Sequence, residues 1–181
     1  WDECRVDKQQ IFSTRSVGNR ITSLEELKQA LAFHAATVAR KARNQKSSCA
    51  ILMAFANTSP FDDLPQNFKD TCTFEFPTND TGKLTKAVTL IATRLFKPGV
   101  SYYKIGVGAL NLVSDKQRQQ DLFSEPDNPA LMQTIDKLNI KLGRDSIFLA
   151  AQGTTHDWAM KRNFLSPQYT TKLKDLPRVI C

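Results

Sequence analysis

The sequence predicts an α+β fold, in which a four-stranded antiparallel sheet has two helices on one face and a small α/β tail domain follows. Four short segments within residues 8–113 alternate apolar and polar residues or are apolar throughout, as strands do. Two longer segments have apolar residues three or four positions apart, as amphipathic helices do. Their order is β-α-β-β-α-β, the split βαβ pattern of ferredoxin-like folds.

The first element is a strand over residues 9–18. The segment QQIFSTRSVG alternates at Ile11 and less regularly further on, and Gly18 ends it. Hydroxyl side chains and Arg15 are interleaved along its second half. This mixture predicts a strand with one face toward the core and one toward solvent.

A helix over residues 22–44 comes next. Thr22 or Ser23 can cap its N-terminus, and Glu25 or Glu26 can complete a capping box. Its apolar face is spaced by three or four residues and consists of Leu24, Leu27, Leu31, Ala35, Val38 and Ala42. His34 lies beside this face, where a structural histidine is expected rather than a catalytic one.

The other elements of this domain follow from the same patterns. The apolar segment 49–57 predicts a buried strand, and the alternation of TCTFEF (71–76) predicts a half-buried one, with a proline-containing loop between them. Residues 83–96 form a second helix, and residues 101–114 alternate as the last strand. The apolar face of the second helix consists of Leu84, Val88, Ile91 and Leu95.

The remaining residues divide into a linker and a tail domain. Residues 114–128 are polar and acidic, with a net charge of −2, and form the predicted linker between domains 8–113 and 129–181. In the tail, a helix ends before Gly143, a short strand is expected at 145–153, and a helical turn lies near Trp158 to Phe164. The apolar face of the tail helix is Leu131, Ile135, Leu138 and Leu142.

Composition limits the class of protein. The 181 residues are 41% hydrophobic and 24% charged, as in ordinary globular proteins, and no apolar run reaches the ~20 residues that span a bilayer. No signal peptide is visible, and Trp1 in place of Met suggests a piece of a longer protein. The four cysteines are too scattered for a zinc site or a disulfide framework, so we expect reduced thiols in a cytosolic protein.

Charge indicates an acidic partner. The net charge is +7, with +5 on residues 1–113 and +4 on residues 129–181. Such a balance suits nucleic acid, although many basic proteins bind none.

Three classes of function share this fold, so the residues must decide between them. An RNA-recognition module needs glycines and a leading cation that TCTFEF lacks. A small enzyme could use the carboxylates of FDDLP or the His156–Asp157 pair, but no nucleophile or metal set accompanies them, and adjacent Asp residues usually form solvated turns.

The third class binds DNA by its backbone. Small hydroxyls, cations and backbone amides near glycines suit phosphate oxygens without reading bases. The first strand supplies such groups, and the last strand adds others beside Gly106 and Gly108. The alternative is an ordinary solvent-facing strand. The candidate contacts are Ser13, Arg15, Ser16, Arg20, Tyr102 and Lys104.

Several segments resemble the C-terminal part of UmuC-type Y-family translesion DNA polymerases, the catalytic subunits of bacterial polymerase V. They are RSVGNRIT (15–22), TSPF (58–61), DLF (121–123) and WAMKRNFLSPQYTT (158–171). The resemblance covers residues 8–178, and the last segment is the most specific. A free-standing DNA- and protein-binding module without polymerase activity is the alternative.

The resemblance implies a set of expectations. Residues 8–113 would be the little finger, which lies along template-primer DNA and holds mainly its backbone. The palm, with its metal-binding carboxylates and Mg²⁺, would lie upstream, so this fragment would have no catalytic residues, no cofactor and no enzymatic activity. The parent enzyme would act in cytoplasmic translesion synthesis and SOS mutagenesis. The tail would serve regulation by UmuD′ and the RecA filament.

The linker contains an apolar pair, Leu122 and Phe123, within polar surroundings. The family's β sliding clamp motif is of the type Gln-Leu-x-Leu-Phe, and QQDLF resembles it at Gln119, Asp121, Leu122 and Phe123 but has Gln120 where an aliphatic residue is usual. A Leu-Phe pair can dock into an apolar pocket of a partner. The alternative is that the pair packs on the chain's own core.

Overall fold

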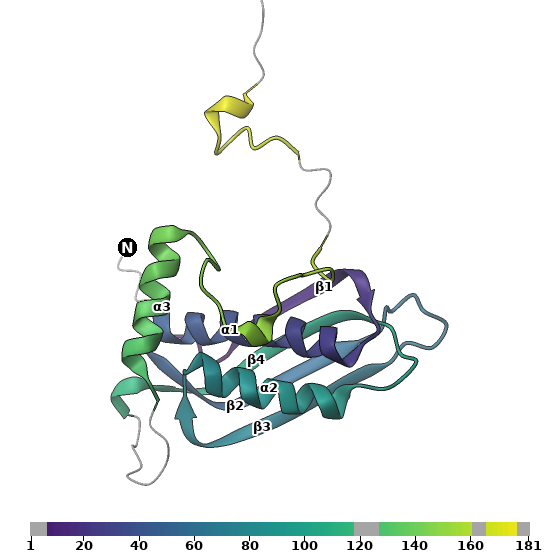
Figure 1. Ribbon diagram of the computed structural model, residues 1–181, viewed down its shortest axis with the longest axis horizontal. Coiled ribbons are helices and arrows are strands. Elements are labelled where there is room, and N and C mark those ends of the chain that lie inside the picture. Colours follow the sequence, from purple (N-terminus) through teal and green to yellow (C-terminus); the bar gives the residue numbers. More distant parts are fainter. Residues whose placement is uncertain (1–6, 118–126, 161–165, 177–181) are drawn as a thin grey trace, which may run out of the picture.

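The computed structural model describes residues 7–117, 127–160 and 166–176. Its centre is a four-stranded antiparallel sheet with helices α1 and α2 on one face (Figure 1). The predicted α+β class, the β-α-β-β-α-β order and the two helices on one face are confirmed. The elements are β1 (Ile11–Ile21), α1 (Leu24–Asn44), β2 (Ser47–Asn57), β3 (Asn67–Thr78), α2 (Thr81–Leu95), β4 (Tyr102–Ser114) and α3 (Pro129–Leu142).

The strands lie in the order β1-β4-β2-β3, and every neighbouring pair is antiparallel. Helix α1 therefore connects two strands that have β4 between them, and α2 connects two strands that have β2 between them. Both connections are split βαβ units. β1 is an edge strand, paired along one side with β4.

Helix α1 forms where the sequence places it. The Ser23 hydroxyl accepts a hydrogen bond from the Glu26 N–H at 3.2 Å and caps the helix. The predicted apolar face is buried from Leu27 to Ala42, whereas Leu24 is half-buried. The corresponding face of α2 is buried as well, so the two helices and the sheet enclose one apolar core.

Two strand boundaries differ from prediction. β1 does not end at Gly18 but continues to Ile21, because Val17 and Ile21 both reach the core and hold the chain against the sheet. The register with β4 shifts between Ser16 and Ile21, which marks a bulge. β3 begins at Asn67 rather than at residue 71, since the alternation of buried and exposed residues already starts there.

The two glycines of β4 make room for aromatic rings. A Cβ on Gly106 would lie 2.6 Å from the Phe55 ring, and one on Gly108 would lie 2.4 Å from the Phe12 ring. Both rings therefore lie across β4, where any larger residue would displace them.

The C-terminal part contains α3 and turns, and the strand predicted at 145–153 is wrong. The Asn139 side chain accepts from the Ile147 N–H at 2.9 Å and donates to its carbonyl at 2.8 Å, so these groups pair with a side chain and not with a strand. A 3₁₀ turn (Ala150–Gln152) follows. The helical turn predicted from Trp158 reaches into residues 161–165, outside the described ranges.

Helix α3 uses only part of its predicted apolar face for packing, because Ile135 and Leu138 are half-buried. Met132 is its buried residue, whereas Leu131 is 48% and Leu142 61% exposed. An ion pair between Asp136 and Arg43 of α1, at 2.7 Å, adds a polar attachment. None of the helices within the described ranges is long and apolar enough to cross a membrane.

Candidate nucleic-acid interface

The face of the sheet opposite α1 and α2 remains open, and its side chains form rows across the four strands. The pairing register places Ser16, Lys104, Asn57 and Asn67 in one row, which we call the first row. The second row is Thr14, Gly106, Phe55 and Lys69, and the third is Phe12, Gly108, Met53 and Thr71. Among these paired residues the charged side chains are Lys69 and Lys104, so this part of the face is positive.

The rows differ in chemistry. The first row offers a hydroxyl, an ammonium group and two amides, all of which can donate hydrogen bonds to phosphate oxygens. The second and third rows add Lys69 and hydroxyls around the apolar surface of Phe55, Met53 and Phe12.

A groove of about 370 Å³ marks the junction of the first two rows. Lys104 and Lys69 lie on strands that have β2 between them, so these two strands are about 10 Å apart at ordinary strand spacing. Phe55 and Met53 form the floor of the groove, and Asn57 and Asn67 lie at its polar end. The groove therefore combines two cations with an aromatic floor.

Two predicted contacts lie on the other face. Ser13 points toward α1, where its hydroxyl is 2.9 Å from Nδ1 of His34. Arg15, two residues along the same strand, is half-buried on that side and acts electrostatically on His34. The structure thus separates Ser13 and Arg15 from Ser16 and Lys104, which share the open face.

Arg20 lies at the end of the bulge and already has a carboxylate partner. Its guanidinium donates to both carboxylate oxygens of Asp62, at 2.6 and 2.9 Å. This bond is the main reason that the pKa of Asp62 is lowered. Asp62 of FDDLP is therefore an ion-pair partner that links the β2–β3 loop to β1, and two N–H groups of Arg20 are already used in this pair.

Tyr102 cannot contact DNA in this fold, which corrects the prediction. The residue is fully buried, and its hydroxyl donates to the Leu95 carbonyl at 3.0 Å and accepts from the Lys97 N–H at 2.8 Å. Burial raises the pKa of this phenol. Tyr102 pairs with Ile21, beyond the register shift, so the alternation that holds from Lys104 onward does not predict its direction. The sequence alternation placed Tyr103 inward instead.

The glycine amides proposed for phosphate binding are also corrected. Gly106 and Gly108 are buried in a strand that pairs on both sides, and the rings of Phe55 and Phe12 cover them. Sequence reasoning missed Lys69, Asn67 and Asn57. The alternation that places Phe68 inside and its neighbours outside was present, but the two prolines nearby favoured a loop.

The clamp-motif residues Gln119, Gln120, Asp121, Leu122 and Phe123 lie outside the described residues. Their described flanks are fixed at one corner of the domain. Before them, Asp115 accepts a hydrogen bond from the Ser48 hydroxyl at 2.7 Å. After them, Asp127 accepts from the Thr78 hydroxyl at 2.9 Å and pairs with Lys83 at 2.8 Å. The predicted linker 114–128 is therefore attached to the sheet at both ends.

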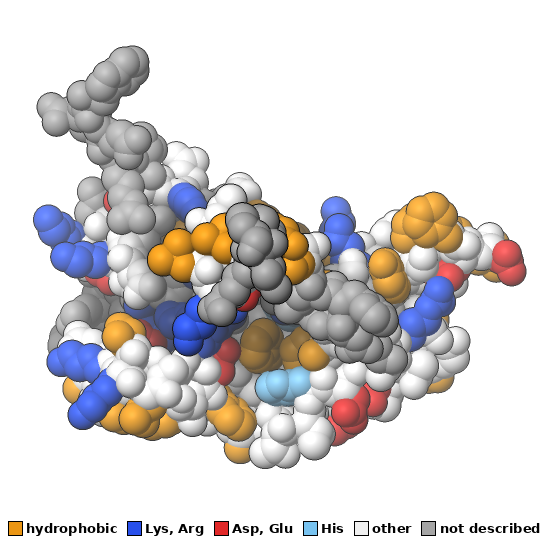
Figure 2. Space-filling model, turned by 90° about the horizontal axis from the view of Figure 1, so that it is seen from above, with side chains coloured by type: hydrophobic (Ala, Val, Ile, Leu, Met, Phe, Trp, Pro, Cys, Tyr) orange, Lys and Arg blue, Asp and Glu red, His pale blue; other side chains and the backbone are white. Residues whose placement is uncertain are grey.

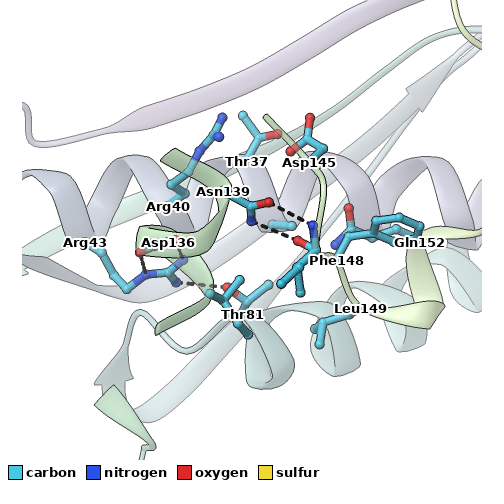
Figure 3. Close-up of a pocket in the computed structure, with 13 residues that line it drawn as sticks. Thr37, Arg40, Arg43, Thr81, Asp136, Asn139, Asp145, Phe148, Leu149 and Gln152 are labelled. Atoms are coloured by element: carbon cyan, nitrogen blue, oxygen red, sulfur yellow. Dashed lines mark hydrogen bonds and ion pairs between the residues drawn. The ribbon is translucent and has the colours of Figure 1, made fainter. Parts of the chain in front are cut away.

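The side of the sheet that carries the helices has a small cavity, unlike the groove on the open face. A cavity of about 40 Å³ lies between α1, α3 and residues 145–152, with Arg43, Asp136 and Asn139 around it (Figure 3). Its polar groups bond to one another: Arg43 also donates to the Thr81 hydroxyl at 2.9 Å. It is an internal junction of helices. In Figure 2, Lys and Arg side chains occur in several separate groups, so charge alone does not locate the interface.

Comparison with known proteins gives two family matches. The impB/mucB/samB family C-terminal domain matches residues 8–122. A domain of unknown function, DUF4113, matches residues 129–179. The chain is similar to Protein UmuC of Salmonella typhimurium, at 35% identity over 98% of this chain and 44% of that protein. It is 33% identical to Protein MucB of Escherichia coli, over 94% and 41%. The chain thus spans less than half the length of these relatives.

Two solved structures are similar to parts of the chain, at low sequence identity. The insertion ternary complex of Dbh DNA polymerase is 11% identical, with a TM-score of 0.47, over 58% of this chain and 29% of that one. The complex of beta-clamp processivity factor and little finger domain of PolIV is 14% identical, with a TM-score of 0.45, over 64% and 99%.

Proposed function

Because the chain belongs to the impB/mucB/samB family through its C-terminal domain, we propose that it is the non-catalytic C-terminal region of a UmuC-like translesion DNA polymerase. In this proposal residues 8–113 are the little finger and hold template-primer DNA. Residues 129–181 are the tail, and the palm with its Mg²⁺ belongs to the rest of the enzyme. The setting is cytoplasmic SOS mutagenesis.

The observation that carries the proposal is the open face of the sheet. It presents Lys104 and Lys69 among hydroxyls and amides, with no carboxylate among the paired residues of its rows. Such groups fix a protein on the phosphates without reading sequence. The proposed DNA-binding residues are therefore Ser16 and Lys104 from the original set, together with Lys69, Asn57 and Asn67.

The test is a titration of duplex DNA at several salt concentrations. Each cation that neutralises a phosphate contributes about 0.9 to the slope of log affinity against log salt. We expect the double variant Lys69→Ala with Lys104→Ala to lower this slope by about 2 and to keep the wild-type melting temperature, because both side chains are exposed.

Lys86→Ala is the matched control, because Lys86 is an exposed lysine on α2, on the helical side of the sheet. It removes one charge without touching the open face. Lys97, exposed in the loop just after α2, supplies a second substitution. If Lys86→Ala with Lys97→Ala weakened binding as much as the open-face pair, the net charge would explain the binding and the proposed face would be wrong.

We further propose that Leu122 and Phe123 dock on the β sliding clamp. Burying two such side chains contributes roughly 3–6 kcal/mol before ordering costs, which gives micromolar affinity or weaker. A weak tether suffices when DNA holds the same molecule. The flanks at Asp115 and Asp127 would transmit the tether directly to the sheet.

Leu122→Ala with Phe123→Ala should abolish clamp binding and leave the melting temperature unchanged, as measured by clamp titration and thermal unfolding. A matched pair that flanks the motif, Gln117→Ala with Ser124→Ala, should leave most clamp binding intact. A loss of several degrees in the Leu-Phe variant would show that the pair packs on the chain's own core instead.

The tail is the proposed site for UmuD′ and the RecA filament. Its support is the exposed side of α3, where Leu131 and Leu142 remain uncovered next to half-buried Leu138. Nearby Lys137 and Lys141 are exposed as well. Apolar side chains edged by cations suit a protein partner with carboxylates around an apolar patch. Titration of the chain with UmuD′ tests this part of the proposal.

A further inference from the structure

A segment of the C-terminal part returns to the sheet, and we call residues 150–159 the strap. It starts with the 3₁₀ turn on α1 and passes over α1 toward β1 (Figure 1). Gly153 lies so close to α1 that a Cβ there would be 2.4 Å from Oε1 of Gln29. Its φ of +74° also belongs to the region that favours glycine.

The end of the strap is fixed in the core. Trp158 is 5% exposed and belongs to the apolar core of the sheet and helices. Its ring lies 5.4 Å from that of Phe33 and 6.1 Å from that of His34, both on α1. His156 adds a third ring contact at 5.2 Å and is held at 3.2 Å from the Gln152 carbonyl.

This anchor places two backbone carbonyls against the β1 bulge. The Gly18 N–H donates to the Trp158 carbonyl at 3.0 Å. The Asn19 side-chain amide donates to the Asp157 carbonyl at 3.1 Å. The β1–β4 pairing is interrupted between Ser16 and Ile21, so the strap gives the Gly18 N–H a partner where β4 offers none.

We propose that the strap sets the position of the β1 bulge and thereby the DNA affinity of the first row of the open face. Ser16 of that row is the last residue paired with β4 before the bulge. Asp157 and Trp158 are positioning residues, because they act through Gly18 and Asn19. This inference rests on the proposed function of the open face, and it gives the tail region a role in DNA binding.

The physical reason is the weakness of an edge strand at a bulge. Residues there have few ladder bonds, and such segments open at low free-energy cost. With the strap in place, the bulge is tied to a tryptophan in the core. Without the strap, the Gly18 N–H and the Asn19 side chain would bond to water. Ser16 would then adjoin a bulge that no longer has a fixed position.

The first test is Gly153→Ala in the full chain. The backbone at Gly153 has φ +74° and ψ 158°, a conformation that essentially only glycine adopts, so alanine there should displace the strap through backbone strain and leave every core side chain intact. We expect duplex affinity to fall about five- to tenfold. Gly99→Ala is the matched control: its φ is +81°, but its Cβ would meet nothing within 4 Å. Equal losses in the two variants would reveal general backbone strain and overturn the inference.

A double-mutant cycle separates positioning from general stability. Asn19→Ala removes one strap bond on the protein surface and should weaken duplex binding about threefold. In a Ser16→Ala background the same substitution should have almost no effect, since the row that it positions is already incomplete. Full additivity of the two substitutions would contradict the proposal.

Hydrogen exchange of the Gly18 amide gives a readout that does not depend on DNA. In Gly153→Ala this amide should exchange at least tenfold faster, because its acceptor on Trp158 has moved. Faster exchange with unchanged DNA affinity would overturn the link between strap and DNA. Failure of wild-type chain to bind duplex would refute the proposed function and, with it, the strap's role in DNA binding.

Discussion

Two regions of the molecule differ in what stabilises them. One is the sheet with its helices α1 and α2, and the other is the C-terminal stretch 129–160. The first encloses long apolar stripes that are fully buried on both helices. Among its described residues, the second contributes Met132, Gln152 and Trp158 as its buried side chains larger than glycine. It therefore has little core of its own, and it folds by docking on α1 and β1.

Polar contacts give this docking its precision. Arg43 binds both carboxylate oxygens of Asp136 at 2.7 and 2.8 Å and also donates to the Asn79 carbonyl at 2.7 Å. Bidentate geometry fixes the orientation of α3 more than it adds stability. The comparison teaches that apolar burial determines whether a region folds, whereas a few directed bonds determine where it lies.

The substitution Trp158→Ala should have the largest effect, and it tests whether the C-terminal stretch stabilises the sheet. Removing a buried tryptophan leaves a cavity and should lower the free energy of unfolding by about 3–5 kcal/mol. Phe61→Ala is the control, since Phe61 is 94% exposed and its loss should cost less than about 0.5 kcal/mol. Urea unfolding measures both. Equal, small losses would mean that the C-terminal stretch contributes nothing to the stability of the sheet.

A smaller effect comes from His34, which lies beneath the strap. Burial, aided by the positive charges of Arg15 and Lys41, lowers its pKa from 6.5 to about 4. Between these values the unfolded chain binds a proton that the folded chain excludes, so stability is complete above pH 6.5 and falls as the pH drops toward 4. The shift corresponds to about 3 kcal/mol at most.

Unfolding measured from pH 7 to pH 4 checks this prediction. Wild type should lose about 2–3 kcal/mol more than His34→Gln, which keeps a hydrogen-bonding group near Ser13. Because both proteins share every carboxylate, their difference isolates the histidine. In Trp158→Ala the pKa of His34 should move back toward 6.5, as followed by NMR. A pKa unchanged by that substitution would show that the strap does not bury His34.

Much of the fold could be predicted from periodicity, because α1, α2 and the strands bury residues at regular spacing. The prediction of a tail strand failed because Asn139 pairs with the Ile147 backbone, a contact between residues that sequence spacing does not reveal. The predicted DNA contacts divided between two faces, since Ser13 and Ser16 lie on opposite sides of one strand. Lys69 was missed because two prolines obscured the start of β3.

The sequence by itself determined the α+β class, the order of the elements, a capped start of α1 at Thr22 or Ser23, and the helix faces that form the core. These depend on local spacing and on the transfer of apolar side chains from water. Only the tertiary structure decided that Tyr102 turns inward and that Lys104 joins Lys69 on an open face. It also decided that Trp158 ties the C-terminal stretch to β1. Strand register and long-range contacts join residues far apart in the chain, and no local pattern records them.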